Sequence, residues 1–283
     1  MSDQRSTILV GTDGSTPSDR AIGWAADEAA RYGKILRTLH VVETSTLDLP
    51  GHTTDGISEG LVESGNQILR NGQSLALQRQ PGLKVETVLV HDRDVPAGLR
   101  QGAGEAVEVV IGHRGRGGFA ELLLGSTGLR LAGHYPGPVI VVRDQTGTTA
   151  GEVVVGLDLT EDPEPALDYA FAAAAARGTR LRALHAWRPA PLAAKAGVDL
   201  QGAARTLLNH LAAVLAPWQD RHPDIEIVRD VVIGHPVDEL VESGATADLV
   251  VVGSRGRSFP LGSVSHGVIH HARCPVAVVR PYD

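Results

Sequence analysis

Five residues near the middle of the chain have the composition and spacing of an anion-binding loop. Two residues separate Gly112 from Gly115, and nine more lead to Gly125, Ser126 and Thr127. Glycine lets backbone N–H groups approach an anion without interference from a side chain, and the two hydroxyl groups are additional donors. The spacing therefore predicts a loop that wraps around a phosphate group.

The residues around this loop support the prediction. The apolar run 107–112 precedes it, and a helical pattern follows Gly125. A helix that begins there would direct its unpaired N–H groups and the positive end of its dipole at a phosphate, which is worth up to ~2 kcal/mol. Arg114 and Arg116 can neutralise phosphate charge. The alternative is a flexible glycine loop followed by a serine helix cap.

A second polar group follows the first predicted strand. The chain reads GTDGS over residues 11–15, which places Thr12 and Asp13 where a strand turns into a helix. In an open parallel sheet, ligands bind beyond the carboxyl ends of the strands, so Asp13 and the glycine loop are expected at the same edge. The alternative for Asp13 is a carboxylate that only caps the turn.

A parallel sheet is needed to bring these groups together. Short Val/Ile/Leu runs without polar alternation indicate strands buried on both faces, and helical stretches separate them. We expect an α/β fold with two tandem doubly wound domains, each a five-stranded, mostly parallel sheet flanked by helices. The expected strands of the first half are residues 7–11, 36–42, 85–91, 107–112 and 138–143.

Local signals also indicate where helices begin and end. Thr16 is expected to cap a helix that has Pro17 at its first position and ends at Gly33. The amphipathic stretches 58–80 and 200–217 are expected to be helices that cover the sheets.

The chain contains two copies of one module. ILVGTD at 8–13 and GKILRTLH at 33–40 recur as VVVGLD at 153–158 and GTRLRALH at 178–185, at an offset of 145 residues. Such duplication organises a whole fold. The polar segment 144–151 has the composition of a linker, so we expect domains at 1–146 and 151–283.

Composition excludes several classes of protein. The formal net charge of −7 disfavours a general nucleic-acid binder. There is no stretch of 18 apolar residues and no apolar leader, which disfavours a membrane protein. The single cysteine, Cys274, excludes a disulfide framework and is expected to be buried and unreactive. The cytoplasm is the expected location.

The pattern G-x2-G-x9-G-[S/T], preceded by a first strand that ends in aspartate, resembles the ATP-binding signature of the universal stress protein family. The likeness covers both copies, in the tandem arrangement of actinobacterial members. The resemblance implies ATP as the ligand, Mg²⁺ as a candidate companion ion, and a regulatory role in stress adaptation. The residues implied to bind nucleotide in the first copy are Thr12, Asp13, Val41, Gly112, Arg114, Gly115, Gly125, Ser126 and Thr127.

Members of this family often pair through their last strands. The resemblance therefore implies that residues 139–143 and 276–280 pair within one chain, as an intramolecular pseudo-dimer, or that such chains form a homodimer. It identifies no protein partner.

The second copy has a shortened glycine loop. Leu159 and Thr160 replace Gly14 and Ser15, and the loop is four residues shorter, which removes roughly 13–14 Å of extended reach. We therefore expect the first domain to be the main nucleotide site. The matching residues of the second copy are Asp158, Gly253, Arg255, Gly256, Gly262 and Ser263.

Other functions remain open from the sequence. One alternative is a slow ATPase or nucleotidyl-type transferase that uses Asp13 with a divalent ion, and another is a nucleotide-free interaction scaffold. No G-x-x-x-x-G-K-[ST] motif occurs, so fast hydrolysis is not expected. GRGGFA at 115–120 fits a dinucleotide pattern but follows the fourth strand, which disfavours NAD. His266 and His270 could share a metal, yet ordinary surface histidines are favoured because no third ligand is evident.

Overall fold

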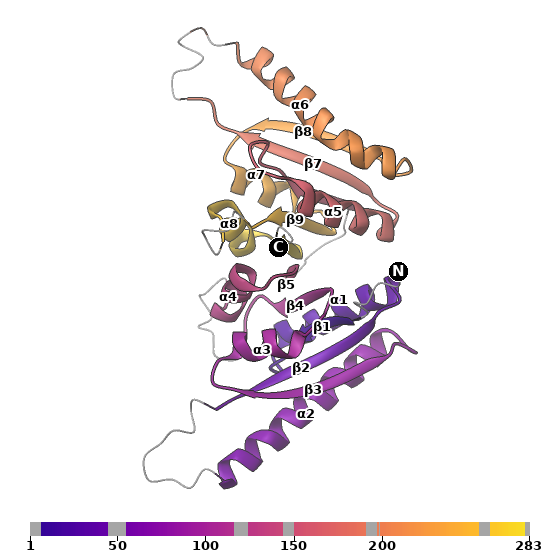
Figure 1. Cartoon of the computed structure of the whole chain (residues 1–283), viewed down its shortest axis with the longest axis vertical. Coiled ribbons are helices and arrows are strands. Elements are labelled where there is room, and N and C mark those ends of the chain that lie inside the picture. The colour runs from indigo at the N-terminus through magenta and orange to yellow at the C-terminus, as the bar shows by residue number, and fades with distance from the viewer. Residues whose placement is uncertain are drawn as a thin grey trace. The chain divides into compact units, whose positions relative to one another are not determined.

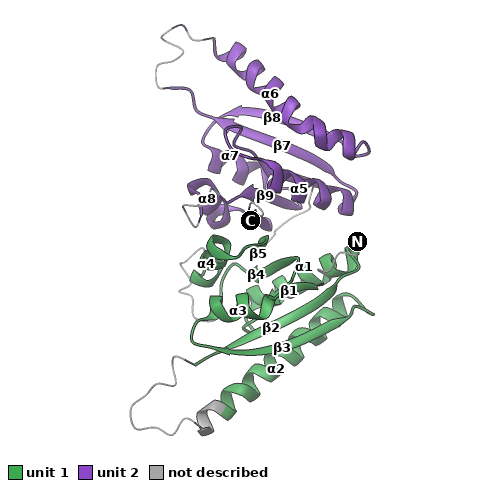
Figure 2. Cartoon of the chain, in the orientation of Figure 1, with its two compact units in different colours: residues 1–144 green, residues 145–283 purple. Residues whose placement is uncertain are grey.

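The computed structural model describes residues 7–44, 55–115, 124–143, 150–190, 197, 199–254 and 261–280. The chain divides into two compact units, residues 1–144 and residues 145–283 (Figures 1 and 2). In both units strands alternate with helices, and this confirms the expected α/β class with two tandem doubly wound domains.

Unit 1 has five strands in the spatial order β3-β2-β1-β4-β5, and the pairings between them are parallel. Helices α1 and α2 pack together on one side of the sheet, and α3 and α4 pack on the other (Figure 1). The strands are β1 (Thr7–Gly11), β2 (Ile35–Glu43), β3 (Val85–Asp92), β4 (Glu108–Gly112) and β5 (Val139–Val142). The helices are α1 (Thr16–Arg31), α2 (Asp55–Arg79), α3 (Val95–Ala103) and α4 (Ser126–His134).

Unit 2 repeats this arrangement with the order β8-β7-β6-β9-β10, again through parallel pairings. Its strands are β6 (Glu152–Gly156), β7 (Arg180–Trp187), β8 (Ile227–Ile233), β9 (Leu249–Gly253) and β10 (Val276–Val279). Its helices are α5 (Glu164–Arg177), α6 (Leu200–Arg221), α7 (Pro236–Ser243) and α8 (Ser263–His271).

The core lies where strands have neighbours on both sides and helices over both faces. All residues of β1, which lies between β2 and β4, are buried, as are Ala21, Ala25 and Ala29, the small residues with which α1 faces the sheet. The expectation that 85–91 is buried on both faces is wrong. Among the described strands β3 pairs only with β2, and its residues are half-buried or exposed.

The first helix begins one position earlier than expected. Ser15, not Thr16, is the cap, with extended backbone angles (φ −87°, ψ 156°) and a hydroxyl that accepts a hydrogen bond from the Ser18 N–H at 3.4 Å. The carboxylate of Asp13 accepts from the Ser15 N–H at 3.0 Å, and this turn holds Ser15 outside the helix. Gly33 ends the region as expected, with a φ of +62°.

Both amphipathic stretches form helices, which confirms that expectation, and α6 continues past its Pro217 to Arg221. Trp218 donates from its indole nitrogen to Asp168 of α5 at 2.7 Å, which anchors the extra turn. Cys274 is buried, as expected. Within the described ranges, no helix combines the length and the apolarity needed to cross a bilayer.

Candidate functional site

The carboxyl ends of β1 and β4 bring together the two polar groups that the sequence separates by a hundred residues. β1 pairs with β4 in parallel, so the turns that follow Gly11 and Gly112 leave the same edge of the sheet. A Cβ atom at Gly115 would lie 2.6 Å from Oδ2 of Asp13. The Asp13 carboxylate therefore lies directly against the backbone of Gly115, and a side chain at position 115 would displace it.

The loop after β4 closes on itself at the start of α4. The N–H of Gly125 donates to the carbonyl of His113 at 2.8 Å, and a Cβ at Gly125 would be 3.7 Å from the Cα of Arg114. The predicted pairs Gly112/Gly115 and Gly125/Ser126 therefore come together, and the intervening residues 116–123 lie outside the described ranges. No side chain of the described residues caps α4, and the first N–H groups of such a helix are potential donors to an anion.

The hydroxyl of Thr12 is engaged inside the turn. Thr12 is buried, with its Oγ1 3.2 Å from the Ser18 hydroxyl and accepting from the Gly14 N–H at 3.2 Å. Gly14 has a φ of +74° and would place a Cβ only 3.1 Å from Ile68 of α2, so both backbone strain and close packing favour glycine there. These contacts fix the position of Asp13.

A histidine in each unit supports this turn, and the sequence analysis did not single it out. Nδ1 of His40 lies 2.7 Å from the carbonyl of Thr12, and Nδ1 of His185 lies 2.9 Å from the carbonyl of Leu157. A carbonyl only accepts, so Nδ1 carries the proton in both rings. The signal was present in the sequence, since both copies of the second repeat motif end in Leu-His.

Val41 lies on β2 near the same edge. It is buried, and a Cβ at Gly98 of α3 would lie 2.8 Å from its Cγ1, so α3 packs tightly against this strand. Val41 is thus an apolar wall next to the polar turn. Its counterpart in unit 2, by the offset of 145 residues, is Ala186.

Negative charge accumulates at the start of α1. Burial and the neighbouring charge of Asp13 both raise the pKa of Asp19. Asp13 and Asp19 therefore both add negative charge to this part of the site.

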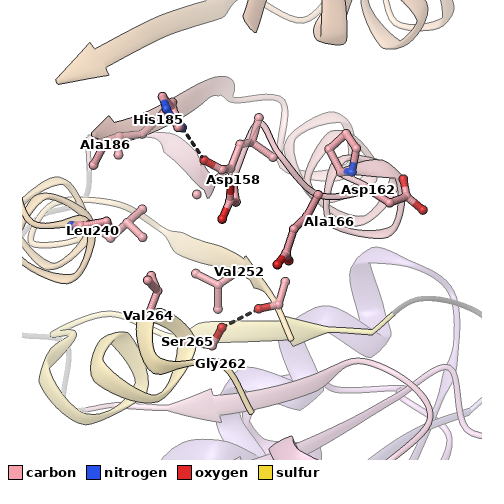
Figure 3. Close-up of a pocket in the computed structure, with 17 residues that line it drawn as sticks. Asp158, Asp162, Ala166, His185, Ala186, Leu240, Val252, Gly262, Val264 and Ser265 are labelled. Atoms are coloured by element: carbon pink, nitrogen blue, oxygen red, sulfur yellow. Dashed lines mark hydrogen bonds between the residues drawn. The ribbon is translucent and has the colours of Figure 1, made fainter. Parts of the chain in front are cut away.

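Unit 2 has a cavity of about 170 Å³ at the equivalent edge (Figure 3). Three residues of the predicted second site line it, namely Asp158, Gly253 and Gly262. Ser263 is exposed at the start of α8, and Arg255 and Gly256 lie outside the described residues. The cavity therefore occupies the place expected for a ligand in a sheet of this type.

Apolar side chains form most of the wall of this cavity. In the close-up, Leu240, Val252 and Val264 lie around the space that Asp158 faces (Figure 3). The hydroxyl of Ser265 donates to the carbonyl of Gly253, which ties the start of α8 to the end of β9.

The family model described as "Universal stress protein family" matches residues 4–143 and 150–280. The chain belongs to this family. A universal stress protein of Mycobacterium tuberculosis is 36% identical over 287 residues, covering 96% of this chain and 96% of the relative. One from Mycolicibacterium smegmatis is 35% identical over 285 residues, covering 97% of each.

A solved structure shares the fold across the whole length. The crystal structure of a universal stress protein from Archaeoglobus fulgidus DSM 4304 has a TM-score of 0.73 and 20% identity, and the match covers 99% of this chain and 98% of that one. The family match over residues 4–143 and 150–280 confirms the resemblance to the universal stress protein family for both copies.

The two universal stress units differ at the first glycine of the loop. A Cβ at Gly112 would lie 2.6 Å from the backbone C and O of Pro17, so β4 and the start of α1 are in close contact. At Gly253, a Cβ would meet no atom of the described residues within 4 Å. The described residues thus exclude a side chain at this motif position in unit 1 and leave space for one in unit 2.

The histidines of α8 belong to neither glycine loop. The rings of His266 and His270 have centroids 4.4 Å apart. Among the described residues, no group of three or more His, Cys, Asp or Glu side chains is arranged to hold a metal ion.

Proposed function

We propose that this universal stress protein binds an adenine nucleotide, ATP with Mg²⁺, mainly through unit 1, and that it has a regulatory role in stress adaptation. The observation that carries the proposal is the meeting of Asp13 with Gly115 beside the uncapped start of α4. The proposed nucleotide-binding domains are residues 1–146 and 151–283, and the proposed location is the cytoplasm.

The residues around this point divide into two groups. Val41 lies on β2, and Asp13 follows the neighbouring strand β1. Together they suit a nucleoside, because Val41 offers an apolar surface and Asp13 an acceptor for hydroxyl or amino groups. The backbone of Gly115 and Gly125, the hydroxyls of Ser126 and Thr127, and the guanidinium of Arg114 suit phosphates. A bound Mg²⁺ would offset the charge of Asp13 and of the phosphates together.

We attribute the regulatory role to a difference in affinity between conformations. A ligand that binds one conformation of unit 1 more tightly than another shifts the population toward that conformation. If the last strands of the two domains pair, as in the proposed intramolecular pseudo-dimer, a conformational change in one domain would affect the other.

Isothermal titration of the full chain with Mg-ATP tests the proposal. Gly115→Val should weaken binding by roughly tenfold or more, because the side chain would enter the space at the Asp13 carboxylate. Gly23→Val is the matched control, since a Cβ at Gly23 meets nothing within 4 Å, and it should bind like the wild type. Wild-type protein without affinity for Mg-ATP would favour a nucleotide-free scaffold instead.

A slow ATPase or transferase is the second candidate, and the negative charge that Asp13 and Asp19 place at the start of α1 favours it. Such a pair can hold a divalent ion or accept a proton. Phosphate release should be measured on the wild type and on Asp13→Ala. Turnover of about one per second or faster that disappears in the variant would establish an enzyme.

A further inference from the structure

The turn at the mouth of the unit 2 cavity is more acidic than its counterpart in unit 1. Glu161 and Asp162 line the cavity, and at the offset of 145 residues they replace Thr16 and Pro17. α1 begins at Thr16, whereas α5 begins only at Glu164. The first helical turn of unit 1 is thus replaced in unit 2 by a loop that carries two extra carboxylates.

The glycine loops do not compensate for this difference. Residues 112–116 and residues 253–257 each contain two arginines. Residues 12–19 contain two carboxylates and residues 157–164 contain four, so the sums are −2 + 2 = 0 in unit 1 and −4 + 2 = −2 in unit 2. A phosphate group would therefore enter a region of like charge in unit 2, where repulsion grows as water is excluded.

The start of α8 also lacks donors that the start of α4 offers. Val264 lines the cavity at the position that Thr127 occupies in unit 1, so an apolar side chain replaces a hydroxyl. The hydroxyl of Ser265 is already bonded to the carbonyl of Gly253. Figure 3 shows Val264 on the side of the cavity opposite Asp158. Both the charge and the wall of this cavity thus disfavour a polyanion.

The remaining features suit the uncharged part of a nucleotide. Leu240, Val252 and Ala186 supply apolar walls for a planar base. Oδ1 of Asp158 already accepts from the N–H and the hydroxyl of Thr160, and a carboxylate has further lone pairs with which to accept from ribose hydroxyls. His185 fixes the backbone next to Asp158, as His40 does next to Asp13. The cavity keeps the nucleoside half of the site and loses the phosphate half.

We propose that the cavity of unit 2 selects an uncharged purine nucleoside over its phosphorylated forms, while unit 1 takes the nucleotide. This rests on the proposed function, because it assigns the same type of nucleoside site to both units. The chain would then respond to two ligands, a nucleotide and the nucleoside that remains when all phosphates are removed.

A pair of matched variants in the full chain tests this assignment. Val264→Phe fills the unit 2 cavity, and Thr127→Phe places the same side chain at the equivalent position of unit 1. Neither residue is fully buried, so both variants should fold, and circular dichroism checks this. The titrants are adenosine, AMP and Mg-ATP, measured by isothermal titration.

Val264→Phe should lower adenosine affinity by about tenfold or more and leave Mg-ATP binding within about twofold, and Thr127→Phe should do the reverse. Adenosine should bind the unit 2 cavity at least about tenfold more tightly than AMP does. The combined change Glu161→Gln and Asp162→Asn should reduce the ratio of adenosine affinity to AMP affinity by about threefold or more. It removes two negative charges and so gives the turn and glycine loop of unit 2 the same net charge as those of unit 1.

The outcomes separate this proposal from the proposed function. If Mg-ATP binding is lost in Thr127→Phe but Val264→Phe leaves adenosine binding unchanged, only the nucleoside assignment fails. The nucleoside assignment alone also fails if Mg-ATP binds both units with equal affinity. If no titrant binds the wild-type chain, the proposed function fails as well.

Discussion

Gly112 and Gly253 show how one motif residue can have two different roles. Each ends a buried strand and begins a glycine loop. The Cα of Gly112 lies against backbone atoms of Pro17, which cannot move aside as a flexible side chain can, whereas the described residues leave open space at Gly253. The motif position is therefore a packing requirement in unit 1 only.

Gly112→Ala should destabilise the chain by about 1–3 kcal/mol, because the new methyl group would overlap backbone atoms. Gly253→Ala is the matched control and should change the free energy of unfolding by less than about 0.5 kcal/mol. Urea denaturation followed by circular dichroism gives both values. Equal effects of the two substitutions would show that the close approach at Pro17 does not exist in solution.

At the scale of elements, α2 is the helix that closes unit 1 over the Asp13 turn. Ile68 covers Gly14, and a Cβ at Gly65 would lie 2.9 Å from the ring of His40. The far end of α2 is tied to α1, where Arg79 donates to both oxygens of Asp27 at 2.7–3.1 Å. α2 therefore links the candidate site to the opposite end of the sheet.

The Asp27–Arg79 pair should make the docking of α2 dependent on pH. Burial acts to raise the pKa of Asp27, but hydrogen bonds from Arg79 and Gln80 outweigh it, and the pKa falls below its ordinary value of 3.8. A lowered pKa stabilises the folded state above pH 3.8, and this contribution disappears as the pH falls through the lowered value.

Arg79→Gln should therefore cost up to about 1 kcal/mol at pH 7, since the arginine side chain is 60% exposed, and less below pH 3.8. Arg70→Gln is the control, because its pair with Glu63 lies within α2 and is exposed on both sides. Denaturation curves at several pH values measure the difference. An effect of Arg79→Gln that does not change with pH would contradict the role of Asp27.

At the scale of the whole molecule, duplication gives one chain two copies of a module that differ at the candidate site. Each unit has its own five-stranded sheet and its own turn held by a histidine. The units differ where they would meet phosphates, through loop length, the Thr127/Val264 exchange and the acidic turn. The two units therefore differ in the residues proposed to contact a ligand.

Hydrogen exchange over the whole chain should show this division. Saturating Mg-ATP should protect the amides of residues 112–115 and 125–128, because a ligand present at 100 times its dissociation constant stabilises the state it binds by about 2.7 kcal/mol. Residues 253–254 and 262–265 serve as the internal control and should change little. Equal protection of both sets would mean that the units share one specificity.

The sequence alone determined the class of fold, the two copies and the loop residues. These properties are written in local patterns, since burial on both faces, helix ends and repeated motifs each depend on residues close together in the chain. Local signals also predict the ends of α1 to within one residue. They indicate Thr16 as the cap where the structure has Ser15, because the turn that Asp13 forms with the Ser15 N–H is not evident from the sequence.

Only the tertiary structure decided which of these residues meet. The contact between Asp13 and Gly115, the exposure of β3 as an edge strand and the wall that Val264 gives the unit 2 cavity depend on segments far apart in sequence. Such contacts are fixed by strand order and helix packing, which a local pattern does not encode. The charged residues can be counted from the sequence. Only the structure shows that Glu161 and Asp162 line the cavity.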